Sequence, residues 1–293
     1  MPSTPPSNAN RGFSLVELLV ATTVMSAVLA AAGVFFVAAR TTITDQILRI
    51  ETLQGLRAAM DEMVRDLRLG GACLPMVGDF VTIDATNSGT DRIFTRTGLV
   101  RPNETCVSTT LASPVNASAT SMTVANASGF TPNMRIYLWD SNATSGEVLN
   151  ITTVNASTNV LGKTTTLTCP HEGGCNTPAY NTGAAVYAVD ERYYYVDTTS
   201  NPSLPVLMLG VNGGTATPFA FGIENLQIQY ELNRNCDTSN GCDVVDLPAN
   251  DTEWSLVNQI YLTLSARSRT VTSSGQYYRV SRTVSAKPRN LIQ

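Results

Sequence analysis

The sequence predicts an α+β fold in which one long N-terminal helix packs on an antiparallel β-sheet. Two observations predict it. Hydrophobic residues recur at every third or fourth position from Ile43 to Leu67, which is the period of one helical face. Beyond Pro75 the period falls to two, which is typical of strands with one buried face. The 293 residues are enough for one large domain, or two modest ones, with a real core.

The helix is expected to begin in a segment that spans a membrane. Glu17 is the single charged residue from Phe13 to Ala39, and Leu18 to Ala39 is an uncharged run of 22 residues. A helix that crosses a bilayer needs about 20 apolar residues. No other part of the sequence is long and apolar enough, so we expect one anchor over residues 13–39.

Residues 40–71 are expected to continue the helix as an amphipathic segment. The hydrophobic positions that define its face are Ile43, Ile47, Ile50, Leu53, Leu56, Met60, Met63 and Leu67. Gly70 and Gly71 supply a stop, because glycine tolerates the backbone conformation that ends a helix. We expect this face to lie against a globular domain that spans residues 72–293.

Short strands are expected throughout that globular domain. The strand-like runs are 80–83, 92–95, 121–124, 134–139, 147–154, 185–189 and 192–196, followed by three late strands near 226–232, 260–266 and 278–284. Gly, Asn, Asp and Pro separate them, as in strands joined by turns. A stretch rich in Thr, Ser, Asn and Ala predicts a β-rich insertion at about 111–190.

The six cysteines favour disulfides and therefore an oxidising compartment. Cys169 and Cys175 enclose one short loop of turn residues, and Cys236 and Cys242 enclose another, which leaves Cys73 and Cys106 as a third pair. Six cysteines permit 15 pairings, so this connectivity stays open. Zinc is the alternative, although its sites usually have a closer ligand spacing and the chain has a single histidine, His171.

Composition and motifs argue against several other functions. The net charge of −4 is unlike that of a protein that binds nucleic acid through a basic surface. The chain has neither a Gly-x-Ser-x-Gly motif nor a glycine-rich phosphate loop, so we expect no enzyme and no catalytic residues. The paired carboxylates at 61–62 and 190–191 are interpreted as solvated positions at the ends of elements.

An acidic, amide-rich segment is a candidate calcium site, since calcium prefers oxygen ligands. Its possible ligands are Asp237, Asp243 and Asp246, among the neighbours Asn235, Asn240, Asn250, Asp251 and Glu253. The spacing matches no EF-hand loop. The alternative is a polar loop closed by a bridge between Cys236 and Cys242, and no cofactor is otherwise expected.

The most specific motif lies just before the anchor. The run from Arg11 to Ala21 reads RGFSLVELLVA, and it resembles the prepilin signature of type IV pilins and type II secretion pseudopilins. The resemblance implies that residues 1–12 are a leader, cut between Gly12 and Phe13 by a prepilin peptidase. It also implies N-methylation of Phe13 and docking into a filament through Phe13 and Glu17.

A carboxylate in an apolar helix costs about 2.5–3.5 kcal/mol at the middle of a bilayer and less near an interface, so Glu17 calls for a partner. The resemblance implies that this partner is the N-terminal amine of a neighbouring subunit. The leader departs from the pattern in having one basic residue, Arg11, and the anchor lacks the proline of many major pilins, with Val34 there instead. The run at 63–71 is similar to the end of the first helix in PilW-type minor pilins and J-type minor pseudopilins.

We therefore expect a minor type IV pilin that primes or caps pilus assembly. It would be a single-pass protein of the inner membrane with its globular domain in the periplasm. The expected partners are the prepilin peptidase, other minor and major pilins, and the inner-membrane assembly platform. The alternatives are a minor pseudopilin of type II secretion, a pilus-tip adhesin and a membrane-tethered enzyme.

Overall fold

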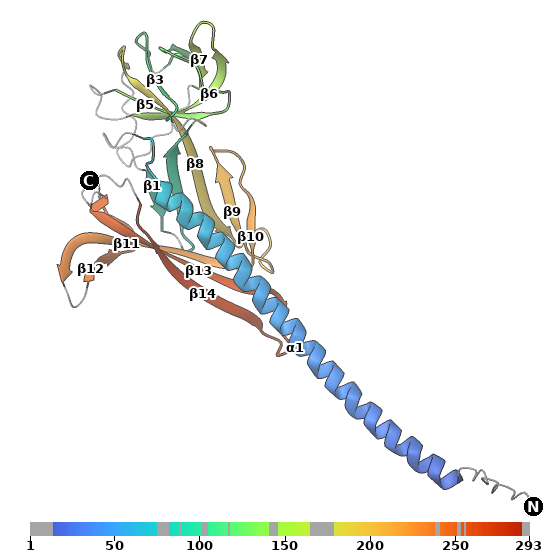
Figure 1. The fold of residues 1–293 in the computed structure, drawn as a ribbon. Coiled ribbons are helices and arrows are strands. Elements are labelled where there is room, and N and C mark those ends of the chain that lie inside the picture. Colours follow the sequence, from blue (N-terminus) through green and yellow to red (C-terminus); the bar gives the residue numbers. More distant parts are fainter. Residues whose placement is uncertain are drawn as a thin grey trace, which may run out of the picture.

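In the part of the chain that the structure describes, a long N-terminal helix is followed by a β-rich body, and the first half of the helix projects far from that body (Figure 1). This computed structural model describes residues 14–74, 82–87, 89–100, 105–116, 118–140, 146–164, 179–237, 241–250, 253–254 and 256–288. The expected arrangement of a long helix packed on antiparallel sheets is confirmed.

Helix α1 runs without a break over Leu15–Leu69, which is 55 residues. At a rise of about 1.5 Å per residue it is roughly 80 Å long. Ser14 is its N-cap, and the chain leaves the helix at Gly70 and Gly71, the latter with a φ of 78° that glycine adopts without strain. The predicted stop at the two glycines is confirmed.

The prediction that one hydrophobic face of α1 covers the sheet is wrong for its first part. Leu56, Met60 and Met63 are buried, whereas Ile43, Ile47 and Ile50 have exposed fractions of 59%, 49% and 52%. The predicted positions are spaced by slightly less than the 3.6 residues of a helical turn, so the stripe winds around the helix. The three isoleucines therefore lie on the side turned away from the sheet.

The strands form two antiparallel sheets. The larger sheet contains β1 (Ile83–Thr86), β2 (Arg92–Gly98), β3 (Ser108–Thr110), β4 (Ser121–Thr123), β5 (Arg135–Trp139), β6 (Glu147–Asn155), β7 (Val160–Lys163), β8 (Ala185–Asp197), β9 (Val206–Val211) and β10 (Thr217–Phe221). Its main order is β1-β2-β8-β5-β6-β7-β4, with β3 and β9 paired to β8 and β10 paired to β9.

The smaller sheet has the order β12-β11-β13-β14, and α1 packs against its strands β13 and β14. Its strands are β11 (Ile223–Asp237), β12 (Gly241–Val245), β13 (Val257–Val271) and β14 (Tyr277–Ala286). The alternation predicted for the late strands is confirmed, because Leu226, Ile228 and Tyr230 of β11 and Leu262 and Leu264 of β13 are buried. Each fully buried side chain of this size contributes about 1.5–3 kcal/mol to folding.

Strand β8 joins two separate hydrophobic cores. Its end at Tyr194 and Val196 packs in the core formed by α1 and the smaller sheet. Its start at Val186 and Ala188 packs in a second core, which is made by residues between 107 and 188. One rigid strand therefore holds the part of the body that is remote from α1, where β3 to β7 lie (Figure 1).

The two strands predicted at 185–189 and 192–196 are in fact this single 13-residue strand. The carboxylates at Asp190 and Glu191 suggested a break, but Glu191 has an exposed fraction of only 4% and lies inside the sheet. Arginines neutralise it, as described below. Strand β1 runs over Ile83–Thr86, and Phe80, where the predicted run starts, lies outside the described residues. No strand-like run in the sequence predicts β3, β7, β9, β10 or β12.

Candidate functional site

The N-terminal end of α1 presents a capped turn with one carboxylate. The Glu17 carboxylate accepts a hydrogen bond from the Ser14 backbone N–H at 3.2 Å, and the Ser14 hydroxyl oxygen accepts one from the Val16 N–H at 3.4 Å. These bonds form a capping box, which satisfies amides that a helix otherwise leaves unpaired. Glu17 itself is exposed. Gly12 and Phe13 lie outside the described residues.

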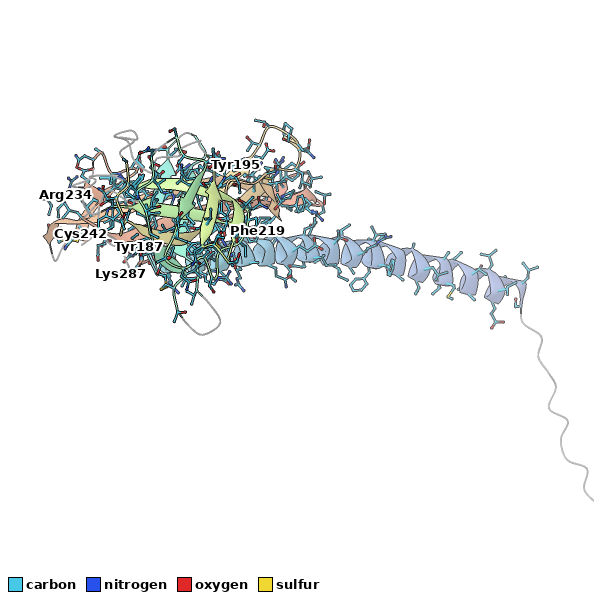
Figure 2. All side chains as sticks on the ribbon, turned by 90° about the horizontal axis from the view of Figure 1, so that it is seen from above. Tyr187, Tyr195, Phe219, Arg234, Cys242 and Lys287 are labelled. Carbon is cyan, nitrogen blue, oxygen red and sulfur yellow. A yellow bond between two sulfur atoms is a disulfide. The ribbon has the colours of Figure 1, made fainter. Side chains whose placement is uncertain are left out.

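The first half of α1 extends away from the body, and its apolar side chains are exposed all around the helix (Figure 2). Leu15, Val34, Phe35 and Phe36 have exposed fractions of 79%, 73%, 76% and 68%. The most apolar window of 18 residues has a mean hydropathy of 2.2, and none of it is buried within the chain. Among the described residues α1 is the one helix with the length and composition to cross a membrane. So large an apolar surface requires lipid or other helices to cover it.

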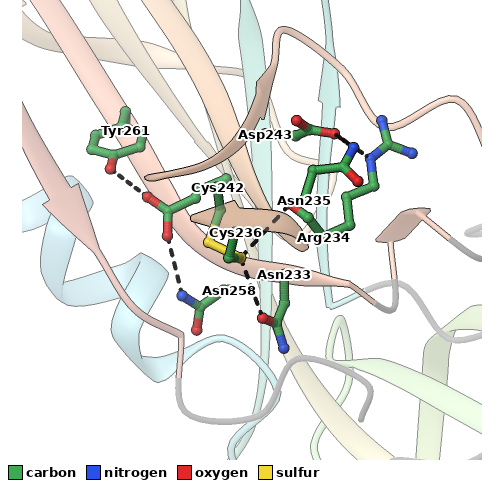
Figure 3. Close-up of a disulfide and its surroundings, with 9 residues drawn as sticks. Asn233, Arg234, Asn235, Cys236, Cys242, Asp243, Asn258 and Tyr261 are labelled. Carbon is green, nitrogen blue, oxygen red and sulfur yellow. Dashed lines mark hydrogen bonds and ion pairs between the residues drawn. A yellow bond between two sulfur atoms is a disulfide. The ribbon is translucent and has the colours of Figure 1, made fainter. Parts of the chain in front are cut away.

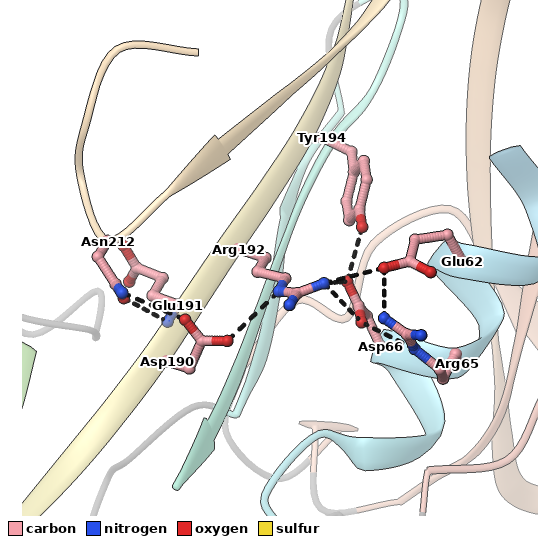
Figure 4. A network of polar contacts seen from close by, with 8 residues as sticks. All are labelled: Glu62, Arg65, Asp66, Asp190, Glu191, Arg192, Tyr194 and Asn212. Carbon is pink, nitrogen blue, oxygen red and sulfur yellow. Dashed lines mark hydrogen bonds and ion pairs between the residues drawn. The ribbon is translucent and has the colours of Figure 1, made fainter. Parts of the chain in front are cut away.

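A polar cluster fixes the second half of α1 to strand β8 (Figure 4). Asp66 is buried in the helix, and the Tyr194 hydroxyl donates to its carboxylate at 2.6 Å. Arg192 donates to Asp66 at 3.3 Å and to Glu62 at 3.0 Å. Burial raises the pKa of Asp66 above its ordinary value, while Tyr194 and Arg192 oppose this rise. The sequence pattern did not predict this cluster.

The cluster continues along β8. The Asp190 carboxylate accepts a hydrogen bond from Arg192 at 3.3 Å and another from the Asn212 side-chain amide at 3.2 Å. On the other face of the strand, Glu191 accepts from Arg96 at 2.8 Å and from Arg135 at 2.6 Å. The interpretation of the 190–191 pair as solvated carboxylates is therefore wrong, because Glu191 is buried between two arginines. At 61–62, Asp61 is exposed but Glu62 pairs with Arg192.

Replacing Tyr194 by phenylalanine is expected to lower the free energy of unfolding by about 1.5–3 kcal/mol, the range for a hydrogen bond to a charged group. The buried Asp66 carboxylate would lose its shortest donor. Denaturant unfolding of the full chain in detergent measures this change. Tyr195→Phe is the control, because the Tyr195 ring lies on the other face of β8, stacked on Tyr193. Equal effects of the two substitutions would contradict the role given to the Asp66 bond.

A disulfide between Cys73 and Cys106 locks the turn at the end of α1 to the segment before β3. The structure thus contains this expected pair, across a sequence separation of 33. Gly98 of β2 approaches the turn so closely that a Cβ there would come within 2.6 Å of the Cys73 carbonyl oxygen. The exit of the helix is therefore held both by a covalent bond and by close packing.

Serine at both Cys73 and Cys106 is expected to destabilise the chain by about 3–4 kcal/mol, because opening a loop of this length restores conformational entropy to the unfolded chain. Serine at Cys236 and Cys242, which are six residues apart, should cost less, about 2 kcal/mol. Thermal and denaturant unfolding of both double variants provides the comparison. A larger effect at the short loop would show that loop length does not govern these bridges.

The bridge between Cys236 and Cys242 closes the hairpin of β11 and β12 (Figure 3). Beside it, Arg234 donates to Asp243 at 2.9 Å and to Glu253 at 2.6 Å, and Asp246 accepts from Gln229 at 3.0 Å. Asp237 lies at the end of β11.

These contacts bear on the calcium hypothesis. An arginine already neutralises Asp243, and in the described part of the chain no three acidic, histidine or cysteine side chains gather as a metal site would require. The described geometry is that of a hairpin held by ion pairs, which is the alternative interpretation. Cys169, Cys175 and His171, with Asn240 and Asp251, lie outside the described residues.

Comparison with known proteins adds one match to the N-terminus. Residues 7–33 match the model of the prokaryotic N-terminal methylation motif. No curated protein matches the sequence. A type IV-like pilin from Thermus thermophilus matches in structure over 55% of this chain and 87% of its own, with 13% identity and a TM-score of 0.22. At that score the structural likeness supports no inference about this chain.

The methylation motif covers Glu17 and about the first third of α1, and the second half of the same helix packs on an antiparallel sheet. The motif thus occupies the part of the helix that the body leaves uncovered. The chain therefore carries the prokaryotic N-terminal methylation motif at the start of a helix with the length and composition to cross a membrane.

Proposed function

We propose that this chain is a minor type IV pilin that primes or caps pilus assembly. The observation that carries the proposal is the methylation motif at the free end of a long helix whose apolar side chains have no cover within the chain. Such a helix is stable in a bilayer and equally stable among similar helices in a filament core. In this proposal the helix lies first in the bilayer and then in the filament core, and assembly moves the subunit from the first to the second.

Processing would prepare that transfer. A prepilin peptidase would cut between Gly12 and Phe13, and Phe13 would then be N-methylated. The positive amine of Phe13 would attract a carboxylate on a neighbouring pilin, and the carboxylate of Glu17 would attract the N-terminal amine of a neighbour. Glu17 is exposed and in contact only with its own helix start among the described residues, so its carboxylate is accessible to such a partner.

A low-copy role is supported by the body. It carries a second core over residues 107–188, attached through β8, in addition to the core that covers α1. A bulky module is easier to accommodate at the end of a filament than in every repeat along it. The body would lie in the periplasm before assembly and would contact other minor pilins and the assembly platform of the inner membrane.

Deletion of the gene in its host tests this proposal, with sheared surface pili and secreted proteins scored together. We expect pili to be lost while secretion stays intact, and expression in trans to restore the pili. Loss of secretion with normal pili would overturn the pilus assignment and identify a minor pseudopilin. Normal pili that no longer bind cells would instead identify a tip adhesin.

A further inference from the structure

The turn between β13 and β14 lies beside α1, close to the end of the uncharged run at Ala39. Figure 1 shows it as the part of the body that reaches farthest along α1 toward the N-terminus. The contact is specific. The Asp45 carboxylate of α1 accepts from the Ser273 backbone N–H at 2.9 Å and from the Ser273 hydroxyl at 2.5 Å. These bonds also lower the pKa of Asp45, so it is ionised at neutral pH.

The position of Asp45 sets the height of this turn above the membrane. Arg40 ends the uncharged run, and Asp45 follows it by five residues, or about 7.5 Å of helix. The headgroup layer on each side of the hydrocarbon core is roughly 5–8 Å thick. If the uncharged run spans the hydrocarbon, the turn therefore lies at the level of the lipid headgroups.

The side chains around the turn are of the kind found at membrane interfaces. Val271 has an exposed fraction of 49%, and Tyr277 and Tyr278 are partly exposed. The Arg267 guanidinium lies 4.5 Å from the centre of the Tyr277 ring, and that of Arg49 lies 5.3 Å from the centre of the Tyr278 ring. Tyrosine and arginine both combine an apolar body with a polar end, which suits the headgroup layer.

The charge of this region is opposite to that of the whole chain. Residues 40–49 and 267–279 contain five arginines and one aspartate, whereas the whole chain has a net charge of −4. Glu224 offsets part of the excess, since it pairs with Arg279 at 3.0 Å and with Arg267 at 3.3 Å. Even with Glu224 included, the region carries three positive charges in excess. A basic surface at this height attracts anionic lipid.

We propose that the turn between β13 and β14, residues 271–277, is a second membrane contact of the anchored subunit and binds anionic lipid headgroups. This inference rests on the membrane-anchored state in the proposed function. The subunit is then held at two points, by its span and by this turn, and the body has a fixed tilt before assembly. Extraction into a filament breaks the contact with lipid.

The test uses the full chain reconstituted in vesicles, with a nitroxide on Ser274→Cys attached without reduction of the native bridges. Ser157→Cys, on the exposed turn between β6 and β7, is the matched control at the remote end of the body. In vesicles of phosphatidylethanolamine with phosphatidylglycerol, we expect collisions with a water-soluble nickel chelate to be several-fold fewer at 274 than at 157. Equal collision rates at the two positions would overturn the proposal.

The charge contribution is tested in the same vesicles. Arg269 is exposed on β13 near the turn, and Arg269→Glu should raise the nickel accessibility at 274. Arg282→Glu, farther along β14, should leave it unchanged. High salt should act like Arg269→Glu on the otherwise unaltered chain, because it screens exposed charges. Protection that persists in pure phosphatidylcholine, in high salt and in Arg269→Glu would overturn the assignment to anionic lipid.

Two further outcomes separate this proposal from others. Protection that appears only at high protein-to-lipid ratio would show that a second copy covers the turn, and would overturn the lipid contact. A chain that does not float with the vesicles would disprove the anchor, and the lipid contact with it. The vesicles contain no pili, so a failure of the pilus role in the deletion strain would leave this result intact.

Discussion

Alanine at Glu17 is expected to leave the chain in the membrane while reducing its amount in sheared filaments more than tenfold. A charge in an apolar helix costs about 2.5–3.5 kcal/mol at mid-bilayer, and less toward the end of the span where Glu17 lies. Pairing with the amine of a neighbouring Phe13 would relieve this cost on assembly, and about 1.4 kcal/mol already corresponds to a factor of ten. Immunoblots of sheared pili and of membranes, each normalised to the major subunit, measure the ratio.

Two variants serve as controls for Glu17. Glu51→Ala removes the same charge from an exposed position of α1 beyond the apolar run and should assemble normally. Glu17→Asp keeps the charge on a shorter side chain and should retain part of the assembly. Wild-type amounts of the Glu17→Ala chain in filaments would contradict the proposed docking role.

Valine at Gly12 is expected to block cleavage almost completely, so that the whole membrane pool keeps the 12-residue leader. The peptidase must approach the scissile backbone closely, and a β-branched side chain obstructs that approach where glycine does not. The precursor would run as a larger band on gels. None of it should enter filaments, because the positive amine would then lie at Met1 rather than at Phe13.

Gly12→Ala is the graded control, since a single methyl group should slow cleavage without abolishing it. Asn10→Val places the same bulky side chain two residues upstream and should have little effect. Complete processing of the Gly12→Val chain would argue against cleavage at this bond.

The sequence predicted the helix, its end and the late strands because each depends on local spacing. The apolar run, the glycines at 70 and 71 and the alternation in β11 and β13 are all visible along the chain. The winding of the apolar stripe around α1 could not be predicted from local spacing alone. Ile43 and Ile50 belong to the same series of apolar positions as Met60, yet they face away from the sheet. The spacing of this series is slightly less than a helical turn of about 3.6 residues, and the difference accumulates over several turns.

The polar contacts between α1 and β8 could not be predicted, since they depend on the register of strands distant in sequence. One feature of the sequence did point to a buried Asp66, because it lies next to Leu67 in the part of the helix whose apolar face is buried. The pairing with Tyr194, 128 residues away, follows only from the fold. The carboxylate of Glu191 was wrongly interpreted as a break between two strands. Its partners Arg96 and Arg135 come from other strands, so their pairing with it could not be predicted from the sequence.

The first residue of the mature chain would show directly whether the leader is cut between Gly12 and Phe13. Chain purified from membranes and from sheared filaments would be digested, and its N-terminal peptide identified by mass spectrometry. We expect this peptide to begin at Phe13 and to carry one methyl group on its amine. A mature pool that begins at Met1 would contradict the account, as would any N-terminus other than Phe13.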